Sequence, residues 1–528
     1  MSEFTQPDID YLELLPMLIV FGIALLGVLV EAFVSRPLRN TVQSAIATLG
    51  LVGALVATVL VGTGLTDHEG ASGLLTAGDT VAIDGPTVFL WGLILVLAVV
   101  GVLAFAERRL ESGLSPFSGY AAATPGSEAE RTATTRGWEH TEVYPLLLFA
   151  VGGMMLFLAS NDLLVMFIAL EVLSLPLYLL TGLARRRRLL SQEAAMKYFL
   201  LGAFSSGFFL YGVALLYGYS GSFQLAQISA AIANDTGNGN LLLLGIGMLS
   251  VGLLFKVGAV PFHQWTPDVY QGAPTPVTAF MSAGTKIAAF GAMLRIFHVA
   301  FADDRSSWAP MLWVIALLSM AVGAVFAIAQ TDVKRMLAYS SIAHTGFIIL
   351  GVLGLQGAGE LAEGEITAVQ AVLFYLVTYG FAVFGAFALA GLVRDGAGEI
   401  SDLRRWSGLG KESPLVAGAF AFFLLAMAGI PLTSGFMGKW AVFSVAAAAG
   451  AWPLVVAAVL FSVVAAFFYV RVIVLMYFSD PIGDGPTVTR PSVLTASGIA
   501  LGLAVTVLLG VLPGPVLDLA AHAGGFIR

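Results

Sequence analysis

Several residue types are scarce in this chain of 528 amino acids, and each absence excludes a class of function. The chain has no cysteine, which rules out disulfides, thiolate nucleophiles and cysteine-ligated iron–sulfur clusters. Its six histidines are scattered, and it carries neither an HExxH metal motif nor a Walker phosphate loop. Only 11% of residues are charged, acidic ones are in excess and no basic tail is present, which argues against nucleic acid as a partner. We therefore expect no cofactor, no metal site and no redox centre in this chain.

Hydrophobic residues dominate what remains. They make up 58% of the chain, and the mean hydropathy is +0.91. No soluble domain of this length has such a composition, so the sequence predicts a polytopic membrane protein in contact with the lipid bilayer. The first ten residues, MSEFTQPDID, lack the basic start of a signal peptide, so we expect the apolar stretch from Tyr11 to Val34 to remain as the first span.

The predicted fold class is all-α, with 14 transmembrane helices. A helix needs about 20 apolar residues to cross roughly 30 Å of hydrocarbon. The ranges that meet this requirement are 12–34, 41–63, 86–106, 143–159, 162–184, 193–218, 240–262, 275–301, 308–329, 333–355, 366–393, 412–448, 452–478 and 492–513.

Two of these spans, the seventh and the twelfth, are predicted to be discontinuous. In the seventh, Pro261 cannot donate a backbone hydrogen bond and clashes with the carbonyl of Val257, so the helix should open just after Lys256. The twelfth is too long for one helix and contains GIPLTSG from Gly429 to Gly435. Broken helices at corresponding positions indicate two structural repeats with a site in each.

The distribution of positive charge supports this count. Lysine and arginine should collect in the cytoplasmic loops. Seventeen of the 25 fall in alternate gaps between the predicted spans, and only Arg305 and Arg528 fall in the other gaps, which are acidic. An odd number of spans would mix the two sets, so we expect both termini on the outer side of the membrane.

These boundaries divide the chain into five parts. They are helices 1–3 in 1–106, a cytoplasmic loop in 107–142, a first repeat of helices 4–8 in 143–301, a second repeat of helices 9–13 in 308–478, and helix 14 in 492–513. The loop is rich in Gly, Ser, Thr and Pro, which predicts a flexible and dispensable segment.

Four ionisable residues fall near the middle of predicted spans: Glu171, Lys256, Lys286 and Lys439. Burying such a group alone costs a few kcal/mol, so it marks a functional site unless it is paired. Glu171 and Lys256 can stabilise each other's charged form, and separating them would release a proton from the lysine. Static ion pairs that fix helix packing, or the lining of a passive channel, remain alternative interpretations.

Three further residues are weaker candidates for proton transfer. His344 shares a helix face with Ser340 and is either a relay imidazole or a hydrogen-bonded packing residue. His263 follows Lys256 by seven residues, but Pro261 makes its direction uncertain. Lys197 is either a proton-loading group near the cytoplasmic side or the partner of Glu193, one helical turn earlier, in a surface ion pair.

Other polar residues are interpreted without a role in chemistry. Arg295, His298 and Arg471 lie near span ends, where side chains can reach the interface. The run from Arg185 to Arg188 is expected to set topology and face lipid headgroups. For four tyrosines within predicted spans, aromatic packing is expected to outweigh hydrogen bonding. They are Tyr178, Tyr198, Tyr375 and Tyr379.

Four segments together resemble one known family, the antiporter-like membrane subunits of respiratory complex I. They are FKVGAVPFHQWTPDVYQGAPTPVTAFMSAGTK, ALEVLSLPLYLL, TDVKRMLAYSSIAHTGF and GIPLTSGFMGKW. The likeness is close over about 143–480, and FHQWTPDVYQGAP, GFMGK and the lack of a long lateral helix after the last span favour one member over its sisters. The loop 107–142 is longer than the family pattern.

The resemblance implies two inverted five-helix repeats in a multi-pass protein of the bacterial plasma membrane. Glu171 and Lys256 would be the coupling pair of the first repeat, Lys286 the bridge, and His344 the group leading to Lys439 in the second. The implied function is proton translocation within NADH:quinone oxidoreductase, driven by quinone reduction in other subunits. Its partners would be the other membrane and peripheral subunits of that complex, with protons and water as cargo.

Three rival functions remain. A subunit of a monovalent cation/proton antiporter would use the same relay without a redox partner, and a structural subunit would only space its neighbours. An integral-membrane transferase is the third, but no exposed acidic or nucleophilic motif supports it.

Overall fold

A computed structural model describes residues 8–65, 73–235, 237–355, 366–395, 398–483 and 485–527. Six of the charged residues that fall in the gaps between predicted spans or at the end of the chain lie outside these ranges. They are Asp67, Glu69, Glu360, Glu363, Glu365 and Arg528.

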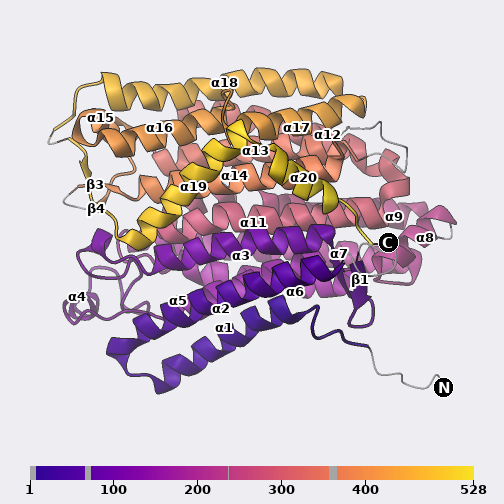
Figure 1. Cartoon of the computed structure of the whole chain (residues 1–528), viewed down its shortest axis with the longest axis horizontal. Coiled ribbons are helices and arrows are strands. Elements are labelled where there is room, and N and C mark those ends of the chain that lie inside the picture. Colours follow the sequence, from indigo (N-terminus) through magenta and orange to yellow (C-terminus); the bar gives the residue numbers. More distant parts are fainter. Residues whose placement is uncertain are drawn as a thin grey trace.

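Long, roughly parallel helices form the described structure (Figure 1). In the N-terminal part these are α1 (Leu15–Phe33), α2 (Arg36–Gly64), α3 (Gly85–Phe105), α4 (Glu128–Thr135), α5 (Val143–Ala159), α6 (Leu163–Thr181), α7 (Arg188–Ser220), α8 (Leu225–Ala233), α9 (Gly239–Val257), α10 (Trp265–Gly272) and α11 (Thr275–Arg295). They continue with α12 (Arg305–Ala329), α13 (Val333–Leu353), α14 (Ala368–Ala390), α15 (Leu409–Glu412), α16 (Pro414–Ala428), α17 (Ser434–Ala448), α18 (Trp452–Phe478), α19 (Val493–Val511) and α20 (Gly514–His522).

Within the described ranges, 12 helices are long and apolar enough to cross a membrane. They are α1, α2, α3, α6, α7, α9, α11, α12, α13, α14, α18 and α19. The helices α5, α16 and α17, with 17, 15 and 15 residues, cover the rest of the predicted spans but are shorter. The helical class is confirmed, while the count of 14 crossings stays a prediction.

Two small antiparallel sheets lie in the connections. One pairs β1 (Gly73–Thr76) with β2 (Val81–Asp84), and the other has the order β4 (Gly398–Glu399), β3 (Val393–Asp395), β5 (Thr487–Val488). Neither was visible in the hydropathy pattern, because both lie in short segments between spans.

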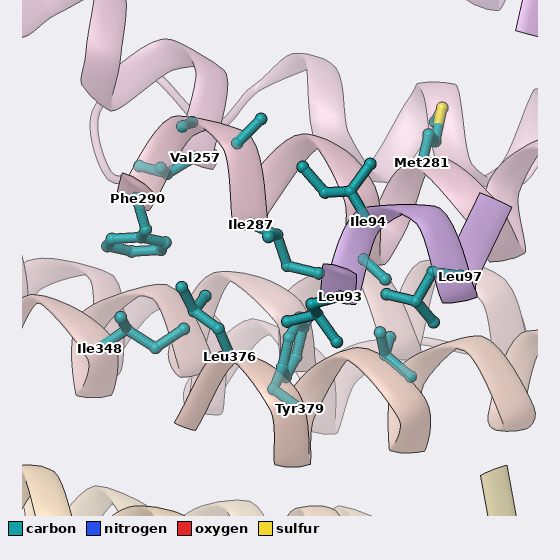
Figure 2. Close-up of a cluster of buried hydrophobic side chains, with 14 of the residues drawn as sticks. Leu93, Ile94, Leu97, Val257, Met281, Ile287, Phe290, Ile348, Leu376 and Tyr379 are labelled. Carbon is teal, nitrogen blue, oxygen red and sulfur yellow. The ribbon is translucent and has the colours of Figure 1, made fainter. Parts of the chain in front are cut away.

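The centre of the molecule is built around α11 and α14, whose apolar stretches are completely buried. Figure 2 shows part of this core, where Ile287 and Phe290 of α11 lie among Leu93 of α3, Ile348 of α13 and Leu376 of α14. A helix that is apolar on all sides can be buried on all sides. The lysine on α11 therefore lies deep in apolar surroundings.

Both predicted helix breaks are present. The first comes directly after Lys256, because α9 ends at Val257 and Gly258 adopts a left-handed φ of 72°. The second comes after α16, where Gly429 has a φ of 85° before α17 begins. Glycine adopts this conformation without the steric cost that other residues meet, and it commonly ends helices. Pro261 lies in the turn that follows the first break rather than at the break itself.

Two helices begin in the same way at opposite ends of the bundle. The Asp162 side chain accepts two backbone hydrogen bonds at the start of α6, and Asp332 does the same for α13. Each aspartate also forms an isolated antiparallel bridge to a later segment, at Gln224 and Asp402 respectively. The first cap lies beside the β1–β2 hairpin, where Asn161 donates to the carbonyl of Thr80, and the second lies beside β4.

The two described ends of the chain meet at the β1–β2 hairpin. Ala77 donates to the carbonyl of Asp8 at 3.0 Å, and the Ile527 amide donates to the Asp84 carboxylate at 3.2 Å. They therefore lie at one end of the bundle.

One predicted snorkelling residue is instead fully buried. Arg295 forms two hydrogen bonds with Asp84, at 2.9 and 2.8 Å, and neither side chain is exposed. The ring of Phe526 lies 5.0 Å from the guanidinium carbon. The snorkelling interpretation of Arg295 is wrong, because its partner Asp84 lies more than 200 residues away and is invisible to local pattern.

The predicted flexible loop 107–142 is packed. It contains α4, and its backbone carbonyls accept hydrogen bonds from Arg185 and Arg188. Phe117, fully buried, forms an antiparallel bridge with Ala184. The expectation that Arg185 to Arg188 face lipid is therefore wrong for Arg188, which is 5% exposed and engaged with the loop.

Candidate functional site

Three buried lysines, the lysine series (Lys256, Lys286 and Lys439), lie on α9, α11 and α17. Their exposed fractions are 3%, 1% and 5%. Each ammonium carries three donors and must find acceptors inside the protein. The acceptors differ from one lysine to the next.

Lys286 closes the first helix break. Its Nζ donates to the carbonyls of Val257 at 2.9 Å and Ser341 at 2.8 Å, and it also contacts the Thr345 hydroxyl. The Val257 carbonyl, which lies where α9 ends, thus accepts a hydrogen bond from Lys286. Ser341 and Thr345 lie on α13, so Lys286 joins helices of both predicted repeats.

Lys439 occupies the second break in the same manner. Its Nζ donates to the carbonyls of Met427 at 3.1 Å and Ala428 at 2.8 Å, which end α16, and to Ser462 at 2.7 Å. A cation at the carboxyl end of a helix is favoured by the aligned peptide dipoles. At both breaks, a glycine in the left-handed conformation ends the helix, and a lysine donates hydrogen bonds to carbonyls at that helix end.

Lys256 has fewer acceptors than the other two. Its Nζ donates to Ser174 of α6 at 2.7 Å, and its other polar surroundings are the rings of Tyr178 and Tyr198, at 5.9 and 5.8 Å from the ring centres. Among the described residues this serine is the only hydrogen-bond acceptor of Lys256.

Glu171 lies one helical turn before Ser174 on α6 and is half-buried. Within the described ranges, no hydrogen bond or ion pair of 4.0 Å or less joins Glu171 to Lys256. Ser174, one turn further along the same helix, is the residue that Lys256 contacts. The structure therefore places the two residues in one neighbourhood, with Ser174 rather than Glu171 in contact with the lysine.

His344 lies between the two halves of the site. Its Nδ1 is 2.8 Å from the Tyr375 hydroxyl, and its Nε2 is 3.4 Å from the Tyr469 hydroxyl, which also contacts Ser340. The Phe347 ring lies beside both His344, with ring centres 5.7 Å apart, and Lys439, at 4.9 Å. The expected shared face of Ser340 and His344 is present.

Tyrosine hydroxyls complete the connection and were missed by the sequence interpretation. Tyr379 is 2.7 Å from the Ser341 hydroxyl, its ring lies 5.7 Å from Lys286, and its centre is 5.2 Å from that of His344. The expectation that aromatic packing outweighs hydrogen bonding is wrong for Tyr375 and Tyr379, whose hydroxyls lie within hydrogen-bonding distance of His344 and Ser341 respectively. Their position in the middle of an otherwise apolar span is a signal, but only the packing of α14 against α13 identifies the partners.

Lys197 and His263 lie apart from the lysine series. Lys197 forms ion pairs of 2.7 Å with both Glu193 and Asp268, and Asp268 also binds Arg335 of α13. His263 lies in the turn between α9 and α10, and its Nδ1 is a buried atom without a hydrogen-bond partner among the described residues. The sequence interpretation did not identify Asp268, in the TPDVY segment, as a candidate. Its carboxylate joins the two predicted repeats by binding both Lys197 and Arg335.

Comparison with known proteins identifies the class to which this arrangement belongs. Residues 160–465 match the family model described as NADH:quinone oxidoreductase/Mrp antiporter, TM, which covers more than half of the chain. The chain therefore belongs to this family of antiporter-like membrane proteins.

Within the family, the chain is similar to proteins named NADH-quinone oxidoreductase subunit N. The chain is 67% identical, over 100% of both sequences, to NADH-quinone oxidoreductase subunit N of Nocardioides sp. strain JS614. It is 34% identical to a chain of respiratory complex I from Thermus thermophilus, with a TM-score of 0.75 and coverage of 97% of this chain and 100% of that chain. The features that favour one family member over its sisters pointed to subunit N, with subunit M as the alternative, and the likeness to subunit N is confirmed.

A chain of the Mrp complex from Dietzia sp. DQ12-45-1b shares the fold. Its TM-score is 0.80 at 23% identity, with coverage of 98% of this chain and 97% of that chain. At this identity the likeness concerns the fold alone.

Proposed function

We propose that the chain translocates protons as a membrane subunit of NADH:quinone oxidoreductase, working with the other membrane and peripheral subunits of that complex. Quinone reduction elsewhere in the complex supplies the energy. The observation that carries the proposal is the series of three buried lysines, two of which bind backbone carbonyls at the helix breaks. Burying ionisable groups in a membrane costs free energy, so their presence there indicates a transport function.

The relay begins at Glu171 and Lys256. A change in the charge or position of Glu171, imposed by a neighbouring subunit, alters how well the Lys256 ammonium is stabilised. Lys256 depends on one serine acceptor, whereas Lys286 and Lys439 have three acceptors each. Lys256 is therefore the member that gives up its proton with the smallest loss of hydrogen bonding.

Transfer then proceeds from Lys286 toward Lys439. Val257, adjacent to Lys256, is bound by Lys286, and the path continues through Ser341 and Tyr379 to His344. Water bridges the remaining gaps between polar groups. Lys197 and His263, which lie apart, serve as loading groups between the cytoplasmic surface and this path.

Two inverted five-helix repeats with 14 crossings underlie this path. The matching helix breaks and the matching aspartate caps at opposite ends of the bundle support such repeats. The meeting of both chain ends at the β1–β2 hairpin supports an even number of crossings. With Arg131 of α4 and the arginines of 185–188 at the cytoplasmic end, both termini lie on the outer side of a bacterial plasma membrane.

The test is NADH-driven proton uptake by inverted membrane vesicles that contain the whole complex with Lys256→Ala or Glu171→Gln. We expect each variant to assemble but to lose proton pumping and coupled turnover. Lys411→Ala is the matched control, because Lys411 forms an exposed ion pair with Asp480. An assembled Lys256→Ala complex that pumps normally would leave only a structural role.

The second candidate function is that of a cation/proton antiporter subunit, which the description of the matching family model, NADH:quinone oxidoreductase/Mrp antiporter, also names. Purification separates the two. Co-isolation with flavin- and iron–sulfur-containing subunits, together with pumping that requires NADH and no Na⁺ gradient, excludes the antiporter.

A further inference from the structure

A pocket of about 960 Å³ lies outside the lysine series, where α4 and the loop around it meet the start of α7. Five arginines line it, and we call it the arginine pocket. They are Arg131, Arg185, Arg186, Arg187 and Arg188. Its size is within the range of pockets that hold small ligands.

Positive charge exceeds negative charge in this pocket. Its two carboxylates, Glu111 and Glu130, are already engaged, Glu111 with Arg186 at 2.7 Å and Glu130 with Arg188 at 3.2 Å. Glu111 is also shared with Arg394. Within the described ranges, three of the lining arginines have no carboxylate within 4.0 Å; they are Arg131, Arg185 and Arg187.

The arginines are held in place by neutral groups. Arg185 donates to the carbonyls of Ser115 at 2.6 Å and Trp138 at 3.0 Å, and Arg187 donates to the carbonyl of Glu399 at 2.7 Å. Carbonyls orient a guanidinium without cancelling its charge. Burial lowers the pKa of Arg185, while Glu139 and Glu111 oppose this effect. A bound anion would stabilise these charges.

Arg131 is the most available member. It lies on the exposed side of α4, and its guanidinium makes no hydrogen bond or ion pair with any described residue. Guanidinium groups bind phosphate through paired N–H donors, so several of them around one pocket suit a phosphate better than a carboxylate ligand.

The pocket opens onto an apolar helix surface. Leu189, the first leucine of α7, is 71% exposed, and Met196, Phe199 and Leu200 further along the same helix are 59%, 45% and 56% exposed. The helix α7 is long and apolar enough to cross a membrane, and its exposed apolar side chains begin at Leu189, beside the pocket. A ligand that satisfies both surfaces carries a phosphate and acyl chains.

We propose that the arginine pocket binds the headgroup phosphate of an anionic phospholipid, whose acyl chains lie along α7. The phosphate is held by Arg131, Arg185 and Arg187, at the level where basic side chains meet anionic membrane lipids. The lipid fixes loop 107–142 against the start of α7. The site does not involve the lysine series, so its failure and that of the proton relay are separate results.

The experiment measures lipid retained by the purified, detergent-extracted complex. Phosphatidylglycerol is titrated into delipidated complex, and bound lipid is quantified by mass spectrometry. We expect the Arg131→Gln, Arg187→Gln double variant to retain one phosphatidylglycerol fewer per complex, with about 30-fold weaker binding at that site. Arg109→Gln is the matched control, because Arg109 is exposed in the same loop but does not line the pocket.

Two further ligands identify the source of the phosphate. Phosphatidylcholine and inorganic phosphate should neither occupy the site nor raise the thermal stability of the complex. Equal binding of phosphatidylcholine, equal stabilisation by inorganic phosphate, or an equal loss of lipid in Arg109→Gln would each overturn the proposal. A single Arg131→Gln variant, which removes no hydrogen bond or ion pair with any described residue, keeps the test valid if the double variant assembles poorly.

Discussion

The three lysines of the series differ in how completely their donors are used. Lys286 and Lys439 each have three acceptors, which is the full capacity of an ammonium group. Lys256 has one, the Ser174 hydroxyl. A small movement of α6 therefore changes the environment of Lys256 more than that of the others, which suits the residue nearest Glu171 for a switch.

Removing that single acceptor tests this idea. A hydrogen bond to a charged group contributes about 1.5–3 kcal/mol, so Ser174→Ala should slow proton pumping roughly tenfold or more. NADH-driven pumping and the amount of assembled complex are measured in the same vesicles.

Ser250→Ala provides the comparison for Ser174→Ala. Ser250 lies on the same helix as Lys256, is 1% exposed, and its hydroxyl has no partner among the described residues. We expect near-normal pumping in this variant. Equal losses in the two variants would show that any buried serine of this region is needed for packing, and would remove Ser174 from the relay.

At the scale of elements, the two breaks are built alike. The helices α9 and α16 both end in a left-handed glycine, and a lysine from a later helix takes the exposed carbonyls. At the second break the space is especially tight. A Cβ on Gly429 would lie 3.0 Å from Cδ and 3.1 Å from Nζ of Lys439.

Gly429→Ala should therefore disturb both the backbone and Lys439. A non-glycine residue with this φ costs about 1–2 kcal/mol, and the new methyl group would also displace the lysine from its carbonyls. We expect a lower thermal stability of the complex and reduced pumping, measured by scanning calorimetry and by vesicle acidification.

Gly247→Ala is the control for this substitution. Gly247 lies within α9, and a Cβ there would meet no atom within 4 Å. Alanine favours helix over glycine by about 1 kcal/mol, so this variant should be at least as stable as the parent. A Gly429→Ala complex with unchanged stability and pumping would contradict the tight fit at the second break.

The helices and their breaks were predictable because hydropathy, proline and glycine act locally. The breaks and the burial of Lys256, Lys286 and Lys439 follow from residues within or beside one span, whereas Lys286 was expected to act as a bridge only because of the family resemblance. The contact of Lys256 with Ser174 was not predictable from the sequence. Several residues on one helix face lie one turn apart, and only the packing of the helices determines which of them meets the lysine. The small sheets and the order within loop 107–142 depend on partners far along the chain.

For the whole molecule, a cluster of polar groups joins the two predicted repeats at the end opposite the chain termini. Glu399 of β4 forms an ion pair of 2.7 Å with Lys334 of α13 and accepts a hydrogen bond of 2.5 Å from Thr275, which starts α11. Lys334 donates to the same threonine at 2.6 Å. The cluster thus links α11 to α13 through a loop carboxylate.

This cluster makes a specific contribution to stability that depends on pH. Burial opposes ionisation of Glu399, but the charge of Lys334, hydrogen bonds from Lys334 and Thr275, and the charge of Arg187 outweigh it and hold its pKa below the ordinary value of 4.5. A carboxyl with a lowered pKa stabilises the folded state fully above the ordinary value, and this contribution is lost as the pH falls through the lowered pKa.

Glu399→Gln should therefore lower stability by a constant amount near neutral pH. Leaving Lys334 buried without its partner costs about 3–5 kcal/mol. Thermal denaturation of the complex should show the same deficit from about pH 6 to about pH 8, and a shrinking deficit only below the ordinary carboxyl pKa of about 4.5. A deficit that already changes between pH 6 and 8 would assign the effect to another titrating group.

The contact between Ile527 and Asp84 also sets an order of events during synthesis. These residues are separated by 443 positions, so Asp84 enters the membrane long before the amide that binds it exists. Until residues 526 and 527 are synthesised, the Asp84 carboxylate at the start of α3 lacks this donor, and Arg295 lacks the Phe526 ring that covers it. The end of the bundle that carries the β1–β2 hairpin therefore gains its full set of contacts only after segments from both halves of the chain have been made and inserted.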